Sequence, residues 1–294
     1  MENTHPAGMA KHEPKLRVRD YFVILGWAVF AALLLKTFVV DAYRIPTRSM
    51  EQTLLPGDFV LVNKLVYGGR TPSHLPLTSY RIPRILFPSL AQPRTGDVLA
   101  FEFPGEGTMP ASPPQTYLKR VVAVPGDTLA IASGTLLING RPVVSLAEGD
   151  TATTPAAATG TTDGAPARWI DHLPGSPLVV PGRGSVLDLG RGHLPRWRSL
   201  IEREGHHLSV DSGGCIRIDG LPSESYTVER NHYFVLGDNR NDSFDSRAWG
   251  LLPDDGLIGK AMLVYWSRSE SPGSGDFVER LRSIRWNRIG ILVR

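Results

Sequence analysis

The sequence predicts a mainly β protein: one N-terminal transmembrane helix, then an antiparallel β-rich domain with an inserted, partly irregular β subdomain. The helix is predicted from a continuous apolar run at residues 21–40, which only Lys36 and Thr37 interrupt. The β character is predicted from composition and pattern. The 30 glycines and 24 prolines argue against long helices, and short runs rich in Val, Ile, Leu, Phe and Tyr recur between turn residues.

The apolar run has the length and flanks of a retained membrane anchor. About twenty helical residues at roughly 1.5 Å each span the hydrocarbon core of a bilayer. A cleaved signal peptide would have a shorter apolar core and a small-residue cleavage site, and a core helix would have a polar face. Here the run continues as Asp-Ala-Tyr-Arg, and Lys36 lies one turn from the boundary, where its ammonium can reach the headgroups.

The charged flank predicts the orientation. Residues 1–20 form a short basic tail that we expect to stay cytoplasmic, with Lys11, Lys15, Arg17 and Arg19. Residues 41–294 would then lie outside the cytoplasm at the inner (plasma) membrane, since no later apolar run is long enough to span a bilayer. The net charge of +3 suits anionic headgroups, and no nucleic-acid-binding motif is present, so we expect membrane lipid and no nucleic acid as partners.

Short β runs and turn-rich stretches divide the outer domain. The runs lie at residues 58–66, 97–103, 117–124, 128–139, 232–236 and 261–266. Asn139-Gly140 is a two-residue hairpin signal. We expect a core of residues 41–144 and 228–270, an insertion of residues 145–227 and a C-terminal segment of residues 271–294. Residues 147–167 are rich in Ala, Thr, Gly and Pro, which predicts a flexible excursion, and residues 174–192 and 205–214 are dense in turns.

Cys215 is the only cysteine, so the chain cannot form an intrachain disulfide. We expect a small semi-buried strand side chain there and not a catalytic thiol, whose pKa would have to be lowered by its surroundings. We also expect no metal site and no cofactor.

Ser49 is a candidate nucleophile close to the membrane. It follows the anchor by nine residues in the string Arg-Ile-Pro-Thr-Arg-Ser-Met. A serine hydroxyl needs a base, which is usually histidine. Of the eight histidines only His232 borders a core strand, where we expect it to pack, and a conventional triad is left possible but unsupported.

Lys119 is a candidate base in place of histidine. It opens the run Lys-Arg-Val-Val-Ala-Val-Pro-Gly-Asp, and burial in such an apolar setting lowers the pKa of a lysine towards neutrality. The alternative is an ordinary solvated lysine at a strand end. Arg120 must face the other side of the strand and needs its own partner.

The polar string at residues 237–250, Gly-Asp-Asn-Arg-Asn-Asp-Ser-Phe-Asp-Ser-Arg-Ala-Trp-Gly, offers that partner. A solvated loop and a calcium loop are the alternatives. Two arginines alternate with the carboxylates and EF-hand spacing is absent, which disfavours calcium. We expect a network of ion pairs that braces a site.

Together these residues resemble bacterial type I signal peptidase (leader peptidase), a membrane-anchored Ser/Lys endopeptidase family. The resemblance covers the anchor and the core but not residues 147–226. Its motifs are Thr47-Arg-Ser49-Met50, Leu55-Pro-Gly-Asp58, Gly96-Asp97-Val98, Lys119-Arg120 through Asp127, Gly237-Asp-Asn-Arg240, Ser243, Asp245-Ser-Arg247, Trp249-Gly250, Gly259-Lys-Ala261 and Tyr265-Trp-Ser267.

The resemblance implies a role for each matched residue. Ser49 would be the nucleophile and Lys119 the general base. The Thr47 hydroxyl and the Ser49 backbone N–H would form the oxyanion hole. Ser243 would orient the lysine, and Met50 would line the floor beside the nucleophile. Supporting ion pairs would join Asp238 to Arg120 and Asp245 to Arg247. Two departures from the family pattern are Thr47 in place of serine and Ala123 in place of a common glycine.

The implied substrates are exported preproteins with signal peptides, cut after small residues at Ala-X-Ala type sites, downstream of the secretion translocon. An extended substrate would add a strand to a sheet edge beside Ser49. Five apolar residues would either dip into the membrane or pack in the core: Leu86, Phe87, Ile289, Ile291 and Leu292.

Three other readings stay open from the sequence. One is a dedicated processing peptidase of the same superfamily with a single substrate such as a pilin. Another is a self-cleaving repressor, which would need a DNA-binding N-terminus and a scissile Ala-Gly or Cys-Gly. The third is a membrane-anchored binding protein without catalysis.

Overall fold

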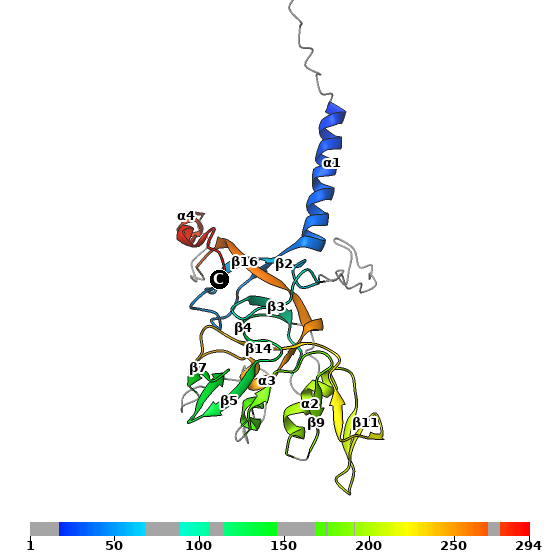
Figure 1. Cartoon of the computed structure of the whole chain (residues 1–294). Coiled ribbons are helices and arrows are strands. Elements are labelled where there is room, and N and C mark those ends of the chain that lie inside the picture. The colour runs from blue at the N-terminus through cyan, green and yellow to red at the C-terminus, as the bar shows by residue number, and fades with distance from the viewer. Residues whose placement is uncertain are drawn as a thin grey trace, which may run out of the picture.

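The computed structural model describes residues 18–68, 89–105, 115–145, 168–173, 176–190, 192–269 and 277–294 (Figure 1). Several sequence predictions lie outside these ranges: the basic residues Lys11, Lys15 and Arg17, the apolar pair Leu86 and Phe87, and the excursion at residues 147–167.

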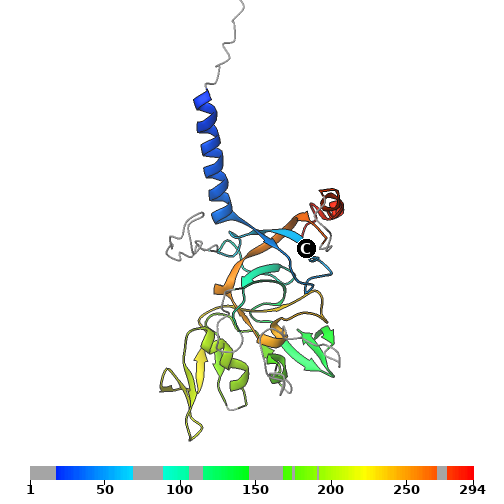
Figure 2. The same ribbon diagram turned by 180° about the vertical axis from the view of Figure 1, so that it is seen from behind.

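Helix α1 (Val18–Leu34) projects from one end of the β-rich domain (Figures 1 and 2). Within the described residues it is the one helix long and apolar enough to cross a membrane, over Val18–Lys36, and none of that window is buried. A π-helical turn, η1 (Leu35–Val39), ends it. The predicted span of 21–40 is therefore shifted, because Val40 already pairs with Asn63 as the first residue of strand β1 (Val40–Arg44).

A seven-stranded antiparallel sheet forms the half of the domain nearest α1, in the order β1-β2-β16-β3-β4-β14-β15. Its other strands are β2 (Asp58–Asn63), β3 (Val98–Glu102), β4 (Thr116–Ala123), β14 (His232–Leu236), β15 (Leu252–Pro253) and β16 (Leu257–Ser267). Strand β1 lies at one edge, directly after the anchor. The mainly β fold class predicted from the sequence is confirmed.

Smaller sheets form the half of the domain farthest from α1 (Figure 1). One has four strands, β7 (Arg141–Ser145), β6 (Thr135–Ile138), β5 (Thr128–Ala132) and β8 (Leu178–Val179). Another contains β10 (Leu208–Val210), β11 (Ile216–Ile218) and β12 (Leu221–Pro222), and a third pairs β9 (Val186–Asp188) with β13 (Ser225–Thr227).

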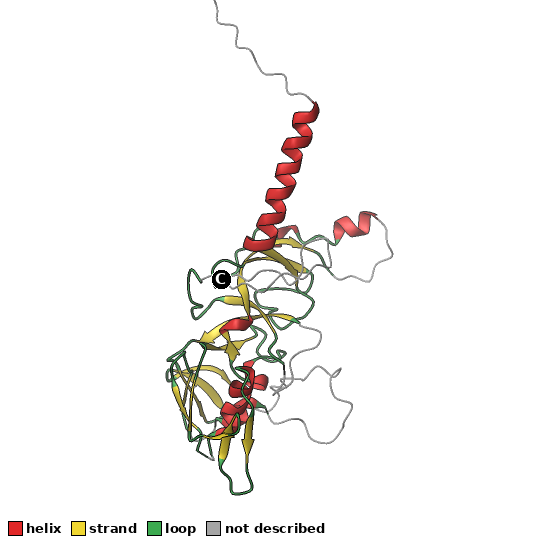
Figure 3. Cartoon of the chain, turned by 90° about the vertical axis from the view of Figure 1, so that its right-hand side faces the viewer, coloured by secondary structure: helices red, strands yellow, loops and turns green. Residues whose placement is uncertain are grey.

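Short helices complete the described chain. They are η2 (Trp169–His172), α2 (Leu194–Arg203), α3 (Ser246–Trp249), η3 (Asp254–Gly256), α4 (Phe277–Arg282) and η4 (Trp286–Arg288). Figure 3 shows α4 at the same end of the molecule as the foot of α1.

The structure corrects three sequence predictions. Residues 128–139 do not form one strand, because Ser133 and Gly134 adopt positive φ and turn the chain between β5 and β6. Helix α2 was not predicted; its buried Trp197, Leu200 and Ile201 lie one turn apart and pack into the core. The boundary expected at residue 145 falls inside a shared unit, because β5 pairs with β8 of the insertion. The hairpin at Asn139-Gly140 is present, with φ of 52° and 76°.

Strand β14 joins the two halves, because both of its faces are buried. Phe234 and Leu236 belong to the apolar cluster that extends into the insertion, whereas Tyr233 and Val235 belong to a cluster under the seven-stranded sheet. This alternation follows from the two-residue period of a strand. The polar string that begins at Gly237 is thereby delivered to a fixed position beside β4.

Candidate active site

Ser49 lies in a tight turn after β1. We call residues 47–54 the nucleophile turn. The carbonyl of Met50 accepts hydrogen bonds from the N–H groups of Thr53 (2.8 Å) and Leu54 (2.6 Å). Met50 and Leu54 are buried in an apolar cluster with Val60 of β2, so the turn is anchored from below and Ser49 stays half-exposed. Met50 thus lies beneath the nucleophile, as expected.

Lys119 lies in the middle of β4 with only 4% of its surface exposed. Burial lowers its pKa to about 8, and the opposing attraction of Asp245 only partly offsets this effect. Its Nζ lies 5.9 Å from the ring centroid of Tyr117 on the same strand face. A large fraction of this lysine is therefore neutral under mildly alkaline conditions, which a general base requires.

Ser49 and Lys119 line one pocket of 790 Å³. The nucleophile turn and β1 form one wall, the first half of β4 forms another, and Asp242 and Phe244 of the polar string close it. Apolar and aromatic side chains alternate with polar and charged ones in its lining, so the pocket offers both apolar surface and hydrogen-bonding groups to a ligand. The lining residues are Tyr43, Arg44, Ile45, Pro46, Thr47, Arg48, Ser49, Met50, Gln115, Thr116, Tyr117, Leu118, Lys119, Asp242 and Phe244.

Thr47 has its hydroxyl beside the nucleophile. Its Oγ1 lies 3.3 Å from Ser49 Oγ, and both residues line the pocket. A hydroxyl and a backbone N–H so close to an attacking serine can both donate to an oxyanion formed there.

Both expected ion pairs are present. Arg120 donates to both carboxylate oxygens of Asp238, each at 2.7 Å. Arg247 donates to Asp245 at 2.9 and 3.1 Å, and this pair is almost fully buried. Asp245 also accepts from the N–H of Gly237 (3.0 Å) and caps α3, so one carboxylate joins the start of the polar string to the first turn of α3.

Gly237 permits the polar string to approach the nucleophile turn. A Cβ at this position would lie 2.5 Å from the Ser49 carbonyl oxygen and 2.1 Å from Ser243 Oγ. Ser49 and Ser243 therefore both lie against this glycine. The Ser243 hydroxyl is buried and has no hydrogen-bond partner among the described residues, so the bond to Lys119 that the resemblance implies is absent.

Three contributors were missed by sequence reasoning. The backbone N–H of Asn239 donates to the Ser49 carbonyl at 3.0 Å. Thr53 bonds to the Arg120–Asp238 pair. Asp58, which is fully buried, accepts from Arg285 and Arg288 of the C-terminal segment. The matching of Leu-Pro-Gly-Asp pointed to Asp58, but its partners are more than 200 positions away, and no local pattern reveals them.

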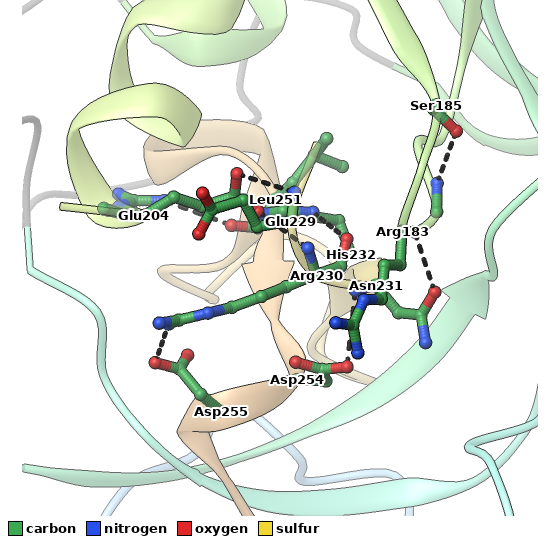
Figure 4. A network of polar contacts seen from close by, with 12 residues as sticks. Arg183, Ser185, Glu204, Glu229, Arg230, Asn231, His232, Leu251, Asp254 and Asp255 are labelled. Carbon is green, nitrogen blue, oxygen red and sulfur yellow. Dashed lines mark hydrogen bonds and ion pairs between the residues drawn. The ribbon is translucent and has the colours of Figure 1, made fainter. Parts of the chain in front are cut away.

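His232, the other candidate base, lies elsewhere. It is only 1% exposed, and its Nε2 is 3.8 Å from Glu204 Oε1 at the end of α2, within the network of Figure 4. Burial lowers its pKa to about 3, so the ring is neutral. It does not line the pocket with Ser49. Packing at the start of β14, as expected from the sequence, describes it correctly.

Within the described ranges no three His, Cys, Asp or Glu side chains come together as a metal cluster. Cys215 lies immediately before β11 and is exposed, with its Sγ 3.7 Å from the Ile216 carbonyl, so the expected semi-buried strand position was wrong.

The sequence matches a known protein family over most of its length. Residues 18–266 match the model of the family described as signal peptidase, peptidase S26. A signal peptidase I from Pseudomonas aeruginosa is 30% identical over 85% of this chain and 71% of its own length. A signal peptidase I from Aquifex aeolicus is 28% identical over 85% of each chain.

A crystal structure of a signal peptidase I from Enterococcus faecalis matches 58% of this chain and 98% of its own, at 20% identity. Its TM-score of 0.25 is too low to say that the two folds are alike. The family match, in contrast, spans most of the chain and includes both Ser49 and Lys119. The chain therefore belongs to the signal peptidase family of S26 peptidases and is a serine endopeptidase that removes signal peptides.

Proposed function

We propose that the protein is a membrane-anchored peptidase that removes N-terminal signal peptides from exported preproteins with a Ser49–Lys119 dyad. The observation that carries this proposal is a buried lysine of lowered pKa that lines the same pocket as a half-exposed serine. Because burial keeps part of the lysine neutral near pH 8, it can accept a proton that an ordinary lysine could not.

The reaction has two stages. Neutral Lys119 takes the proton of Ser49 Oγ, and the oxygen attacks the scissile carbonyl. The Thr47 hydroxyl and the Ser49 N–H stabilise the resulting oxyanion. Lys119 then gives its proton to the leaving amine, which releases the mature protein and leaves the signal peptide as an ester on Ser49. Lys119 next takes a proton from water, hydroxide attacks the ester, and the signal peptide leaves as a carboxylate while Ser49 regains its proton.

The pocket supports specificity for small residues. Its walls include Tyr43, Ile45, Tyr117 and Leu118, which present apolar surface in the same pocket as Ser49. Strand β1 is at the edge of the seven-stranded sheet, so an extended peptide can pair with it beside the nucleophile turn. Both features favour an Ala-X-Ala type site. They do not favour the pilin-specific alternative over a general one.

The anchor supports action at a membrane surface. Helix α1 leads through the turn η1 into β1, and β1 leads into the nucleophile turn, so the pocket lies within about 30 Å of the end of η1 by chain length. The basic N-terminal tail would be cytoplasmic and the catalytic domain extracytoplasmic. Four large apolar side chains are exposed in the described part of the C-terminal segment, at and after α4: Leu281, Trp286, Ile291 and Leu292. Their exposure favours contact of this end of the molecule with lipid. Preproteins would reach it from the secretion translocon.

Cleavage of a model preprotein in detergent tests this proposal. Wild type should release a product whose new N-terminus follows an Ala-X-Ala site, and Ser49→Ala and Lys119→Ala should lose activity by orders of magnitude while remaining folded. Retention of most activity by Lys119→Ala would contradict the dyad. A folded wild type that cuts only one preprotein of many would favour the single-substrate alternative.

A further inference from the structure

The distance between nucleophile and base must be fixed by contacts between segments far apart in the chain. Ser49 belongs to the nucleophile turn, Lys119 to β4, and the polar string follows β14. A displacement of about 1 Å between reacting groups can cost about 100-fold in rate. The residues that connect these segments therefore matter as much as those that react.

Thr53 connects all of these segments through its hydrogen bonds. Its hydroxyl donates to Asp238 Oδ2 (2.5 Å) and accepts from Arg120 Nη2 (3.0 Å). Its backbone N–H donates to Met50 (2.8 Å), and its carbonyl accepts from Arg288 (2.9 Å). Every hydrogen-bonding group of this half-buried residue is thus in use.

The Thr53 hydroxyl bonds to both members of an ion pair, Arg120 and Asp238. Arg120 holds Asp238 through two bonds of 2.7 Å, and Arg120 is the immediate neighbour of Lys119 on β4. Burial alone would raise the pKa of Asp238, but hydrogen bonds from Arg120 and Thr53 outweigh it and hold the pKa below its usual range. The carboxylate is therefore charged, and its bonds to Arg120 and Thr53 are strong.

A second link runs from the polar string back to the nucleophile turn. Asn239 follows Asp238 and donates its backbone N–H to the Ser49 carbonyl at 3.0 Å. The turn is thus held to one rigid pair at two points, the Thr53 side chain and the Ser49 backbone. Loss of the first leaves the turn attached to the polar string through Asn239, whose side chain also donates to the Arg48 carbonyl at 3.3 Å.

We propose that Thr53 is a positioning residue that sets the separation of Ser49 from Lys119 by tying the nucleophile turn to the Arg120–Asp238 pair. This inference rests on the proposed dyad. The Thr53 hydroxyl should therefore affect the rate of the chemical step. It should affect substrate binding little, because Thr53 does not line the pocket.

Three threonine variants of the full chain test the inference in the preprotein assay. Thr53→Val keeps the shape and removes the hydroxyl; we expect kcat to fall about 10- to 100-fold with KM changed less than about threefold. Thr53→Ser keeps the hydroxyl and should return kcat to within about threefold of wild type. Thr128→Val is the matched control, since Thr128 is also half-buried and its hydroxyl makes no bond within the described ranges.

The outcomes separate this inference from the proposed function. Wild-type kcat in Thr53→Val, or an equal loss in Thr53→Ser or in Thr128→Val, would overturn the positioning role. A wild type that does not cut, or that cuts without Lys119, would instead overturn the dyad. If Thr53→Val loses its folded circular dichroism spectrum, Thr53→Ala decides the matter with the same expected fall in kcat.

Discussion

Two buried bases, Lys119 and His232, lie in surroundings that differ in one respect. Both are almost fully buried, and burial lowers the pKa of each, to about 8 and about 3. Lys119 lines a pocket together with a serine, whereas His232 is enclosed beneath the insertion. Burial alone thus produces a neutral base, and access to a nucleophile and substrate gives that base a function.

The polar groups around His232 hold the insertion to the segments on either side of β14. Glu204, at the end of α2, accepts hydrogen bonds from the Tyr226 hydroxyl (2.5 Å) and from the N–H groups of Glu229 and Arg230 (3.0 Å each). Its neighbour Arg203 donates to the carbonyls of Leu251 and Trp249. The bonds to Glu229, Arg230 and Leu251 cross from the insertion to the segments around β14 (Figure 4). A buried polar network whose carboxylate is well bonded fixes the relative position of two units.

The largest expected contrast is in activity. Lys119→Met should lower kcat/KM by about 10³- to 10⁴-fold, because no histidine and no second lysine is among the described residues that line the pocket with Ser49. His232→Phe, which preserves ring size, should stay within about threefold of wild type. Initial rates of preprotein cleavage measure both, and comparable losses in the two variants would break the comparison.

Stability should reveal the cost of burying Lys119. Its folded pKa of about 8 is below its ordinary value of 10.5, so the unfolded chain binds more protons between these values and stability rises with pH across them. Below pH 8 the full penalty is about 3 kcal/mol. Lys119→Met should therefore be more stable than wild type by up to this amount at pH 7, with the gain shrinking towards pH 10.5.

Urea denaturation of both proteins at pH 7, 9 and 10.5 measures this gain. A difference that does not change with pH would show that Lys119 is not titrating between these limits in the folded protein.

The attachment of the insertion should depend on Glu204. Glu204→Gln replaces one acceptor oxygen with an amide that faces N–H donors, and we expect a loss of about 2–3 kcal/mol in the free energy of unfolding. Glu229→Gln, on the exposed side of the same network, should cost less than about 1 kcal/mol. Cleavage rates should remain close to wild type in both while the protein is folded. A large fall in kcat with normal stability would show that Glu204 acts on the reaction.

The smallest expected effect concerns Ser243. Its hydroxyl is buried without a partner within the described ranges, so Ser243→Ala should be as stable as wild type or more stable by about 1 kcal/mol. Chemical denaturation at one pH is sufficient. A clear loss of stability would mean that the hydroxyl is bonded in solution, as the family resemblance implies for a serine that orients the lysine.

Sequence reasoning located features that depend on local pattern. Residues 232–236 form the predicted strand because four apolar residues follow His232 and end at Gly237. The Asn139-Gly140 turn follows from the tolerance of both residues for positive φ. The order of the matched motifs also predicted that Ser49 and Lys119 act as a pair.

Features that depend on tertiary contacts were not predictable in this way. Helix α2 lies between two turn-rich stretches, and its buried face packs against residues from η2 and distant strands. The close approach at Gly237 requires knowledge that Ser49 lies opposite. Thr53 is one hydroxyl in an ordinary turn, and only its contact with Arg120 and Asp238 distinguishes it.

The pH dependence of kcat/KM for wild type and His232→Phe tests most directly whether Lys119 is the base. This parameter reports the ionisation of the free enzyme. We predict that activity rises with a single ionisation near pH 8 and that His232→Phe leaves this ionisation unchanged. An inflection near the ordinary histidine value of about 6.5 that disappears in His232→Phe would contradict the assignment of Lys119.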